Sequence, residues 1–529
     1  MPKIEYVEDS WETEQLLESL SPPVRNWFKD KFPDFTDPQK LAIPRILNGE
    51  HLLLCSPTGS GKTLTAFLTI IDDLVRKSLD GSLGNSVQCV YISPIKALAN
   101  DIQKNLIGPL TEIRERYLPS RAKEIKVGLR TGDTSRRDRE RMLRKPPHIL
   151  ITTPESLGLA LASKRFRPLL NELQWMIIDE MHSLVPTKRG THLALSLALM
   201  DSVIDSQVQR IGISATMEPL DAVAEFLVAS DSRESDTEPQ HVAIAKVSGS
   251  RRLDLDIILP TPRFSSLPVK EILDHNVDRI KEIVEAHTTT LVFVNTRQMT
   301  ETVVQKLKIL GTEGVEGHHG SMDKAIRLDV EQRLKNGLLR SVVSSSSLEM
   351  GIDIGSVDCV IQVGSPGSIA TGLQRIGRAG HQVDGLPRAR LLPTSPQDLL
   401  EMVSLQNGIL RGSMDLLKFP QNSLDVLAQF LIGLTIIREW DIDDSYELVT
   451  AAWPYRELPY DDFIEVLDLL EEERRVWVDW EENRFGKRGY AQMIYYTNIG
   501  TIAPSNNYLV FTSDAVSYTH LTLPTICSV

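Results

Sequence analysis

The segment SPTGSGKT, residues 56–63, constrains the fold of this chain more than any other feature. It follows the apolar run HLLLC and precedes LTAFLTIIDDLV, whose apolar residues recur at helical spacing. A glycine-rich loop between a strand and a helix lets backbone N–H groups approach phosphate oxygens closely. Lys62 would add a positive charge beside the phosphates, and the Thr63 hydroxyl could ligate Mg²⁺. An ordinary Gly-Ser turn would not require the flanking strand and helix.

Alternating apolar runs and helical patterns predict two α/β units, over residues 1–230 and 241–415. Buried parallel strands are predicted in the first unit at HLLLCS, CVYISP, HILITTP, WMIIDE and RIGISAT, and in the second at TTLVFVNT, SVVSSSS and VDCVIQVGS. LDVEQRLKNG is predicted as a helix between two strands of the second unit. The polar segment DSRESDTEPQ, residues 231–240, is predicted as a linker or surface loop.

After residue 415 the sequence changes character. SLDVLAQFLIGLTIIREW and YDDFIEVLDLLEEERRVWVDW have helical periodicity, which predicts a helical, winged-helix-type unit over residues 416–495. The following RFGKRGYAQMIYYTNIGTIAPSNNYLVF alternates like β-strands, and residues 496–515 are expected to begin a truncated domain. VSYTHLTLPTICSV, residues 516–529, resembles a translated sequencing adapter and is interpreted as a non-native tail; a genuine C-terminal strand is the alternative.

Composition narrows the function classes. The 529 residues carry a formal net charge of -13, which argues against a protein that coats nucleic acid by charge alone. A local basic track over residues 121–145, with ten Lys/Arg against four Asp/Glu, is either a nucleic-acid contact or a solvated helix face. Four widely spaced cysteines, the absence of a long apolar run and the lack of a signal-peptide pattern favour a reduced cytoplasmic protein with no membrane partner.

The strand predicted in WMIIDEMH ends at two carboxylates, Asp179 and Glu180. Beside a phosphate loop, Asp179 would hold Mg²⁺ through water and Glu180 would orient and deprotonate an attacking water. Without that loop, an ordinary Asp-Glu turn at the end of a strand would be an equally good interpretation of the pair. His182 is either a structural histidine or a link to the next motif, because no partner ligand stands at metal-binding spacing.

Besides these two sites, the chain carries further motifs in a fixed order: Gln39 in FTDPQKLAIP, SPIKALAND, RTGDTS, TTPESL, SAT, FVNTR, SSSSLEMGIDIG and QRIGRAGH. This set resembles superfamily 2 helicases. SPIKALAND, DEMH, KRGTHLALSL, HHGSMDKAIRL, NSLDVLAQFLIG and NIGTIAP are similar to the large helicase-related (Lhr) family in particular. The resemblance implies two tandem RecA-like domains with parallel sheets, followed by a winged-helix-type domain and a further β-containing domain.

The resemblance also implies a role for each matching residue. For ATP and Mg²⁺ these are Gln39 at the adenine, Thr58, Gly59, Ser60, Gly61, Lys62 and Thr63 at the phosphates, Asp179 and Thr63 at the metal, and Gly351 and Asp353 from the second unit. Catalysis would involve Lys62, Glu180, Gln374 and the arginine finger Arg378. Coupling of hydrolysis to movement would involve His182, Ser214, Thr216 and His381. The nucleic-acid contacts would be Pro94, Lys96, Arg130, Thr153, Thr296, Arg297 and Ser345.

Two positions depart from common patterns. His381 stands where many superfamily 2 proteins have a second arginine, which leaves Arg378 as the main finger, and the large helicase-related pattern itself has histidine there. Ser345 replaces the usual threonine but keeps the hydroxyl. The resemblance implies an ATP-dependent helicase or translocase that moves 3′ to 5′ on single-stranded DNA, unwinds DNA or RNA–DNA hybrids and acts in DNA repair. An RNA-remodelling ATPase and a non-hydrolysing ATP-binding clamp are the alternatives.

Overall fold

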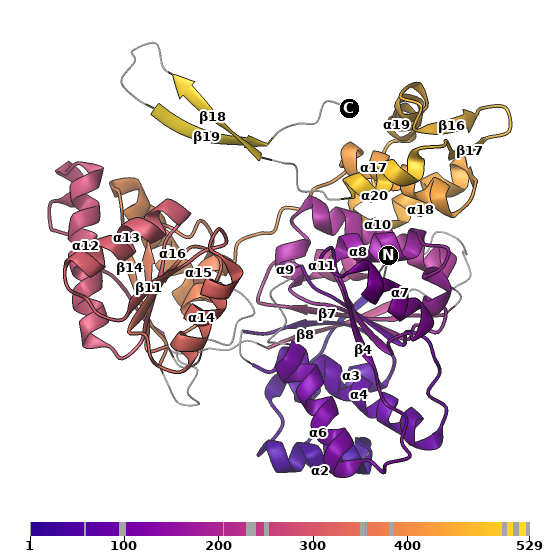
Figure 1. Cartoon of the computed structure of the whole chain (residues 1–529), viewed down its shortest axis with the longest axis horizontal. Helices are drawn as coiled ribbons and strands as arrows, with labels where there is room; N and C mark the ends of the chain where they lie inside the picture. The colour runs from indigo at the N-terminus through magenta and orange to yellow at the C-terminus, as the bar shows by residue number, and fades with distance from the viewer. Residues whose placement is uncertain are drawn as a thin grey trace.

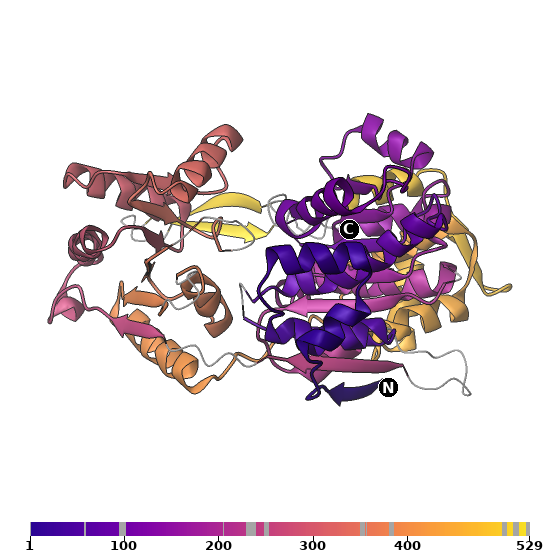
Figure 2. The same cartoon turned by 90° about the horizontal axis from the view of Figure 1, so that it is seen from below.

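The computed structural model describes residues 2–57, 60–94, 102–204, 206–228, 240–247, 253–349, 355, 357–379, 386–499, 505–511 and 518–524. Two separate parallel sheets lie side by side, in both the front view (Figure 1) and the view from below (Figure 2). A third, mainly helical unit packs on the first of them (Figure 1). The predicted fold class is confirmed.

The first sheet has eight parallel strands in the order β1-β8-β2-β7-β6-β3-β5-β4. Its strands are β1 (Lys3–Tyr6), β2 (His51–Cys55), β3 (Cys89–Ile92), β4 (Val127–Arg130), β5 (Ile149–Thr152), β6 (Trp175–Ile178), β7 (Gln209–Ser214) and β8 (His241–Lys246). Its helices are α1 (Thr13–Ser19), α2 (Pro22–Lys31), α3 (Asp37–Leu47), α4 (Lys62–Asp80), α6 (Gly108–Tyr117), α7 (Arg136–Arg144), α8 (Pro154–Ala162), α9 (Met181–Leu184), α10 (Lys188–Val203) and α11 (Leu220–Leu227).

Both faces of this sheet are buried, which is why its strands are continuous apolar runs. Successive side chains of a strand point to opposite faces. Leu52 and Leu54 of β2 therefore pack with α1–α4 and α6, whereas Leu53 and Cys55 pack with α8, α10 and α11. The strands predicted in the first unit are confirmed.

The second sheet has six parallel strands in the order β11-β12-β10-β13-β14-β9. They are β9 (Asp254–Ile257), β10 (Thr290–Phe293), β11 (Val315–His318), β12 (Ser341–Ser344), β13 (Cys359–Val363) and β14 (Arg388–Leu392). The helices are α12 (Val269–Ala286), α13 (Arg297–Ile309), α14 (Lys324–Lys335), α15 (Ile369–Ile376) and α16 (Pro396–Arg411). Separate apolar clusters on its two faces make this unit a body with its own core.

The boundary predicted between the two units is wrong at one strand. Strand β8, placed in the second unit by the sequence prediction, pairs in parallel with β1 and β2 of the first sheet. Its apolar residues Val242 and Ile244 join the first unit's core, which fixes its place. We therefore propose that the first unit extends to residue 246.

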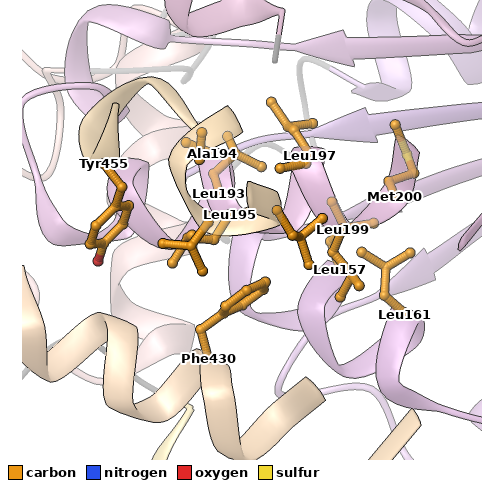
Figure 3. Packing of buried hydrophobic residues seen from close by; sticks show 14 of the residues in the cluster. Leu157, Leu161, Leu193, Ala194, Leu195, Leu197, Leu199, Met200, Phe430 and Tyr455 are labelled. Carbon is orange, nitrogen blue, oxygen red and sulfur yellow. The ribbon is translucent and has the colours of Figure 1, made fainter. Parts of the chain in front are cut away.

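The third unit contains α17 (Leu424–Ile437), α18 (Ile442–Ala451), α19 (Tyr460–Glu472), α20 (Ala491–Asn498) and an antiparallel sheet of β15 (Trp440–Asp441), β17 (Arg484–Lys487) and β16 (Val476–Asp479). Although it follows the second unit in sequence, its apolar residues are continuous with the first unit's core. Phe430 and Tyr455 lie against Leu195 and its neighbours on α10 (Figure 3). Hydrogen bonds from Trp453 and Arg456 to Glu225 of α11 reinforce this contact.

Two expectations near the C-terminus need correction. The alternating pattern around AQMIYYTN predicted strand, but these residues form helix α20, because Ala491 and Tyr495 bury one helical face. Residues 518–524 were not expected to continue the β pattern, yet β19 (Tyr518–Pro524) pairs antiparallel with β18 (Ser505–Phe511). In the described part of the chain, no helix is long and apolar enough to cross a membrane.

Candidate active site

Two groups of predicted site residues lie next to each other along the carboxyl edge of the first sheet. The adjacent strands β2, β7 and β6 lead to the phosphate loop, Ser214 and Asp179. The next three strands, β3, β5 and β4, lead to Pro94, Thr153 and Arg130. Carboxyl ends of parallel strands share one edge, so one half of this edge carries the predicted ATP residues and the other the predicted nucleic-acid residues.

The phosphate loop enters α4 through Gly61, which has a left-handed φ of 86°. A Cβ here would make only ordinary contacts, 3.5 Å from Thr36 Oγ1 and 3.6 Å from Gln39 Nε2, so it is the left-handed conformation that favours glycine. Lys62 Nζ donates to the Ser56 carbonyl at 2.7 Å, and Ser60 Oγ lies 2.7 Å from Ser56 Oγ. Thr63 lies in the first turn of α4, whereas Thr58 and Gly59 lie outside the described residues.

Gln39 is buried beside this loop. Its Oε1 accepts from the backbone N–H of Thr36 at 2.9 Å and completes the capping box that starts α3. Its Nε2 faces the space beside Gly61. The structure thus places Gln39 near the phosphate loop and gives half of its amide a structural partner.

Asp179 and Glu180 follow β6 directly. Asp179 is 4% exposed, accepts a hydrogen bond from the Tyr91 hydroxyl and lies near Lys62. Burial, together with the charge of Glu180, raises the pKa of Asp179 above its ordinary range. Glu180 has a φ of 54°, a left-handed conformation that is costly for a side chain and that turns the chain sharply between β6 and α9.

His182 connects these carboxylates to two further motifs. Its Nδ1 lies 3.1 Å from Ser214 Oγ and accepts from the Ala215 N–H at 3.2 Å. Burial, with the charge of Lys62, lowers the pKa of His182 to about 3, so the ring is neutral at pH 7. Because Nδ1 accepts, Nε2 carries the proton. Nε2 faces Glu180 Oε2 at 3.3 Å and the side-chain amide of Gln374 in the second unit.

The side-chain amide of Gln374 lies against His182 Nε2, so the two α/β units meet in a direct polar contact. The proton on Nε2 has two oxygen acceptors within reach: the Glu180 carboxylate, and the Gln374 oxygen when the amide is turned toward the ring. Thr216, the other predicted coupling residue of the first unit, is half-buried two residues after Ser214.

The predicted finger Arg378 follows helix α15 in the second unit. Its Nε and one terminal nitrogen donate to the Glu349 carbonyl at 3.1 and 2.7 Å. The nearby Arg375 is buried, pairs with the Glu349 carboxylate and stacks on Phe293. Gly351, Asp353 and His381 lie outside the described residues.

Two of the predicted nucleic-acid residues of the first unit, Thr153 and Arg130, make contacts within the protein. Thr153 caps α8 by accepting from the Ser156 N–H at 3.4 Å. Arg130 stacks on Phe166, 4.4 Å from the ring centre, and burial lowers its pKa to about 10. Pro94 is buried, and Lys96 lies outside the described residues.

In the second unit, Thr296 caps α13 by accepting from the Met299 N–H at 3.1 Å. The next residue, Arg297, donates to Ser321 Oγ at 2.6 Å. Ser345 is 8% exposed and directly follows β12, the neighbour of β10. These three residues therefore lie at adjacent strand ends of the second sheet.

The basic track over residues 121–145 includes helix α7, which has no buried residue. It lies beside edge strand β4 and contributes, with α6 and β4, to a groove of about 1150 Å³. The groove lining includes Arg114, Arg141 and Lys145 together with Glu124 and Asp138, so its charge is mixed. This arrangement fits a solvated helix face.

Sequence reasoning missed three residues that hold the predicted site together. Tyr91 bonds to Asp179, Glu349 holds both Arg375 and Arg378, and Arg189 contacts the Pro94 and Thr153 segments. Their motifs, VYISP, SLEMG and KRGTH, were visible. Their roles depend on contacts between distant segments.

Three family models match consecutive parts of the chain. A model described as "DEAD/DEAH box helicase" matches residues 36–224, and "Helicase conserved C-terminal domain" matches residues 275–382. "Large helicase-related protein, winged helix domain" matches residues 407–521. The fold and these matches define a two-domain helicase core of the DEAD/DEAH box class.

Curated relatives and solved structures extend this match over most of the chain. "ATP-dependent helicase Lhr-Core" of Methanocaldococcus jannaschii is 43% identical over 510 residues, which are 95% of this chain and 59% of that protein. "Lhr helicase/uracil glycosylase" of Escherichia coli is 35% identical over 94% of this chain and 36% of its own length. The Mycobacterium smegmatis helicase Lhr bound to ssDNA and AMP-PNP has a TM-score of 0.81 at 38% identity, covering 93% of this chain and 63% of that one.

The chain belongs to the large helicase-related family, and it spans little more than half the length of the archaeal Lhr-Core relatives it matches.

Proposed function

We propose that this chain is the motor portion of an ATP-dependent nucleic-acid helicase or translocase. The carrying observation is the sheet edge that places the phosphate loop, Asp179 and Ser214 beside Pro94, Thr153 and Arg130. The His182–Gln374 contact joins this edge to the second unit. ATP hydrolysis at this edge would then move the second unit against the first, and so change the spacing between the nucleic-acid residues of the two units.

The residues present suit a divalent cation. Asp179 is a buried carboxylate whose ionisation is opposed by burial and by Glu180, so a cation at this point would stabilise the ionised pair. Asp179 and Thr63 offer the oxygen ligands that Mg²⁺ prefers, and Mg²⁺ would there offset phosphate charge.

The chain's own residues account for hydrolysis. Lys62 would bind the β- and γ-phosphates, and Glu180 would orient water and accept its proton. Arg378 would leave the Glu349 carbonyl and stabilise charge on the γ-phosphoryl group. His182 is neutral and contacts both Ser214 and Gln374, so it would couple a change at the ATP site to both units.

We infer single-stranded DNA as the tracked strand, 3′-to-5′ movement, and unwinding of DNA or RNA–DNA hybrids in DNA repair. A relative at 38% identity bound to ssDNA and AMP-PNP supports the tracked strand, and the polarity, the duplex substrates and the repair role rest on the family resemblance. The contacts would be Pro94, Lys96, Arg130 and Thr153 from the first unit and Thr296, Arg297 and Ser345 from the second. Gly351, Asp353, Thr216 and His381 keep the roles that the resemblance implies.

One assay separates this proposal from its two alternatives. ATP turnover is measured with single-stranded DNA, with single-stranded RNA of the same sequence, and with neither. Stimulation mainly by DNA supports the proposal, and stimulation mainly by RNA supports an RNA-remodelling ATPase. Binding of ATP without turnover under all three conditions would support a clamp.

A further inference from the structure

Arg189, the second residue of α10, contacts both segments that follow β3 and β5. Its Nε and one terminal nitrogen donate to the two carboxylate oxygens of Glu155 at 2.5 and 3.1 Å. Its other terminal nitrogen donates to the Pro94 carbonyl at 2.7 Å. The guanidinium therefore joins a loop and a helix start that are about 60 residues apart in sequence.

The surroundings hold this side chain in place. Arg189 and Glu155 are only 22% and 20% exposed, so their ion pair is shielded from water. Burial disfavours ionisation of Glu155, but the hydrogen bonds and charge of Arg189 outweigh it and lower the pKa of Glu155. The backbone beside Arg189 is fixed too, because a Cβ on Gly190 would lie 2.4 Å from the Leu184 carbonyl oxygen at the end of α9.

Glu155 and Pro94 lie within two residues of the predicted nucleic-acid contacts Thr153 and Lys96. Neither contact segment is held by the sheet alone, because each begins where its strand ends. A planar guanidinium with a fixed fork of donors sets both distance and angle between its acceptors, which a lysine cannot do.

We propose that Arg189 is a positioning residue that holds the Pro94 segment and the start of α8 at a fixed spacing, so that the nucleic-acid backbone meets a pre-formed surface. This inference rests on the proposed function. It assigns to the KRGTH segment a role in strand binding rather than in ATP binding. Pre-forming a binding surface removes an ordering cost from association.

The competing role is direct binding of a phosphate by Arg189, and Glu155 distinguishes the two. If Arg189 bound phosphate itself, Glu155→Gln would release the guanidinium, remove a negative charge and tighten strand binding. If Arg189 positions the two segments, Glu155→Gln breaks the fork and weakens strand binding.

The experiment compares Arg189→Ala, Arg189→Lys and Glu155→Gln in the full chain, with Arg279→Ala as control. Arg279 lies on α12 of the second unit in an exposed pair with Glu282, so its loss changes net charge equally. Affinities are measured for a labelled single-stranded DNA and for a fluorescent ATP analogue at one salt concentration. Hydrogen exchange of the backbone amides is followed at Ser93, which precedes Pro94 and donates to the Thr152 carbonyl, and in α8.

We expect Arg189→Ala to weaken strand binding by ~10-fold or more, the scale for truncating one partner of a shielded charge pair, with ATP-analogue affinity unchanged. The strand affinity of Arg189→Lys should lie between that of Arg189→Ala and that of the unmodified chain. Glu155→Gln should also weaken strand binding. Arg279→Ala should change neither strand affinity nor ATP-analogue affinity. Exchange should quicken at Ser93 and in the first turn of α8. The lysine variant keeps the test usable if the alanine variant does not fold.

Unchanged strand affinity in both Arg189 variants, tighter binding by Glu155→Gln, or unchanged exchange would each overturn the inference. A parent chain that binds neither DNA nor RNA would instead refute the proposed function. In that case the exchange measurement alone still decides whether Arg189 orders the two segments.

Discussion

The two α/β units present different chemistry at their carboxyl edges. The first holds buried groups: Asp179 against Tyr91, and His182 against Ser214. The second presents Gln374 to the first unit and keeps Arg378 on its own Glu349 carbonyl. The first half of the site is thus built into a buried core, whereas in the second half the proposed finger Arg378 would have to leave the Glu349 carbonyl to act.

Packing strengthens this contrast. The third unit shares its apolar core with the first unit, although it follows the second in sequence (Figure 3). The second unit has its own two clusters. If the chain is the proposed motor, the second unit would move against the larger body formed by the first and third units, and the His182–Gln374 contact would change with that movement. The following predictions test this division.

The largest effect is expected at Arg378. Arg378→Ala should lower ATP turnover by roughly 10³-fold and change nucleotide affinity much less, because a finger acts on transition-state charge. Steady-state rates and fluorescent-nucleotide binding measure the two quantities. Equal losses of rate and affinity would contradict a finger role.

Arg375→Ala is the matched comparison for Arg378→Ala. Arg375 is buried against Glu349, Gln362 and Phe293, so its loss should lower the thermal stability of the second unit. A variant that stays fully stable but loses turnover selectively would reverse the roles of the two arginines.

At Glu180 the expected loss is smaller. Glu180→Gln should bind ATP and Mg²⁺ yet turn over at least ~100-fold more slowly, the scale for losing a positioned base. Single-turnover hydrolysis separates chemistry from product release. Glu271→Gln, on α12 of the second unit, is the control and should leave the rate unchanged. Near-normal turnover in Glu180→Gln would show that Glu180 is not the general base.

The sequence was informative wherever function depends on a local pattern. Continuous apolar runs that end in polar residues located the strands, and the phosphate loop and DEMH located the buried half of the site. Strand β8 was misassigned because a polar linker is a weaker boundary signal than the pairing of β8 with β1 and β2. Helix α20 was missed because its burial of Tyr495 depends on packing against α17 and α8.

Acid should destabilise the first unit selectively. Among the described residues, the histidines whose pKa is lowered all lie in that unit, and burial is the main cause. The pKa falls to about 4 at His51 and His192 and to about 3 at His182, and it is lowered at His148 as well. Since the unfolded chain binds protons near pH 6.5 and the folded unit does not, stability falls as the pH drops below 6.5. Each of the first three histidines costs up to ~2 kcal/mol by pH 5, while the raised pKa of Asp179 opposes part of this loss.

Tryptophan fluorescence reports on the first and third units, which share one core, and not on the second, because none of the seven tryptophans lies in residues 247–415. Urea unfolding followed by fluorescence should shift to lower urea between pH 7 and pH 5. His192→Gln should reduce the shift, and His275→Gln, an exposed change on α12, should not. An unshifted fluorescence transition would show that the buried histidines do not lower the stability of the first unit at pH 5.

The smallest effect is expected at the nucleotide base, which the first unit alone would read. Gln39→Ala should reduce discrimination of ATP from GTP by roughly 10-fold, the scale of one lost hydrogen bond in a shielded site. The change also removes the capping bond to Thr36, so some loss of stability at α3 is expected with it. Gln39→Glu separates the two effects, because a carboxylate keeps the acceptor for Thr36 but cannot donate to adenine. Competition between ATP and GTP should therefore show the same loss in both variants, while thermal stability recovers in Gln39→Glu. If the glutamate variant discriminated like the parent chain, Gln39 would act only as a cap, and the base would be recognised by another part of the site.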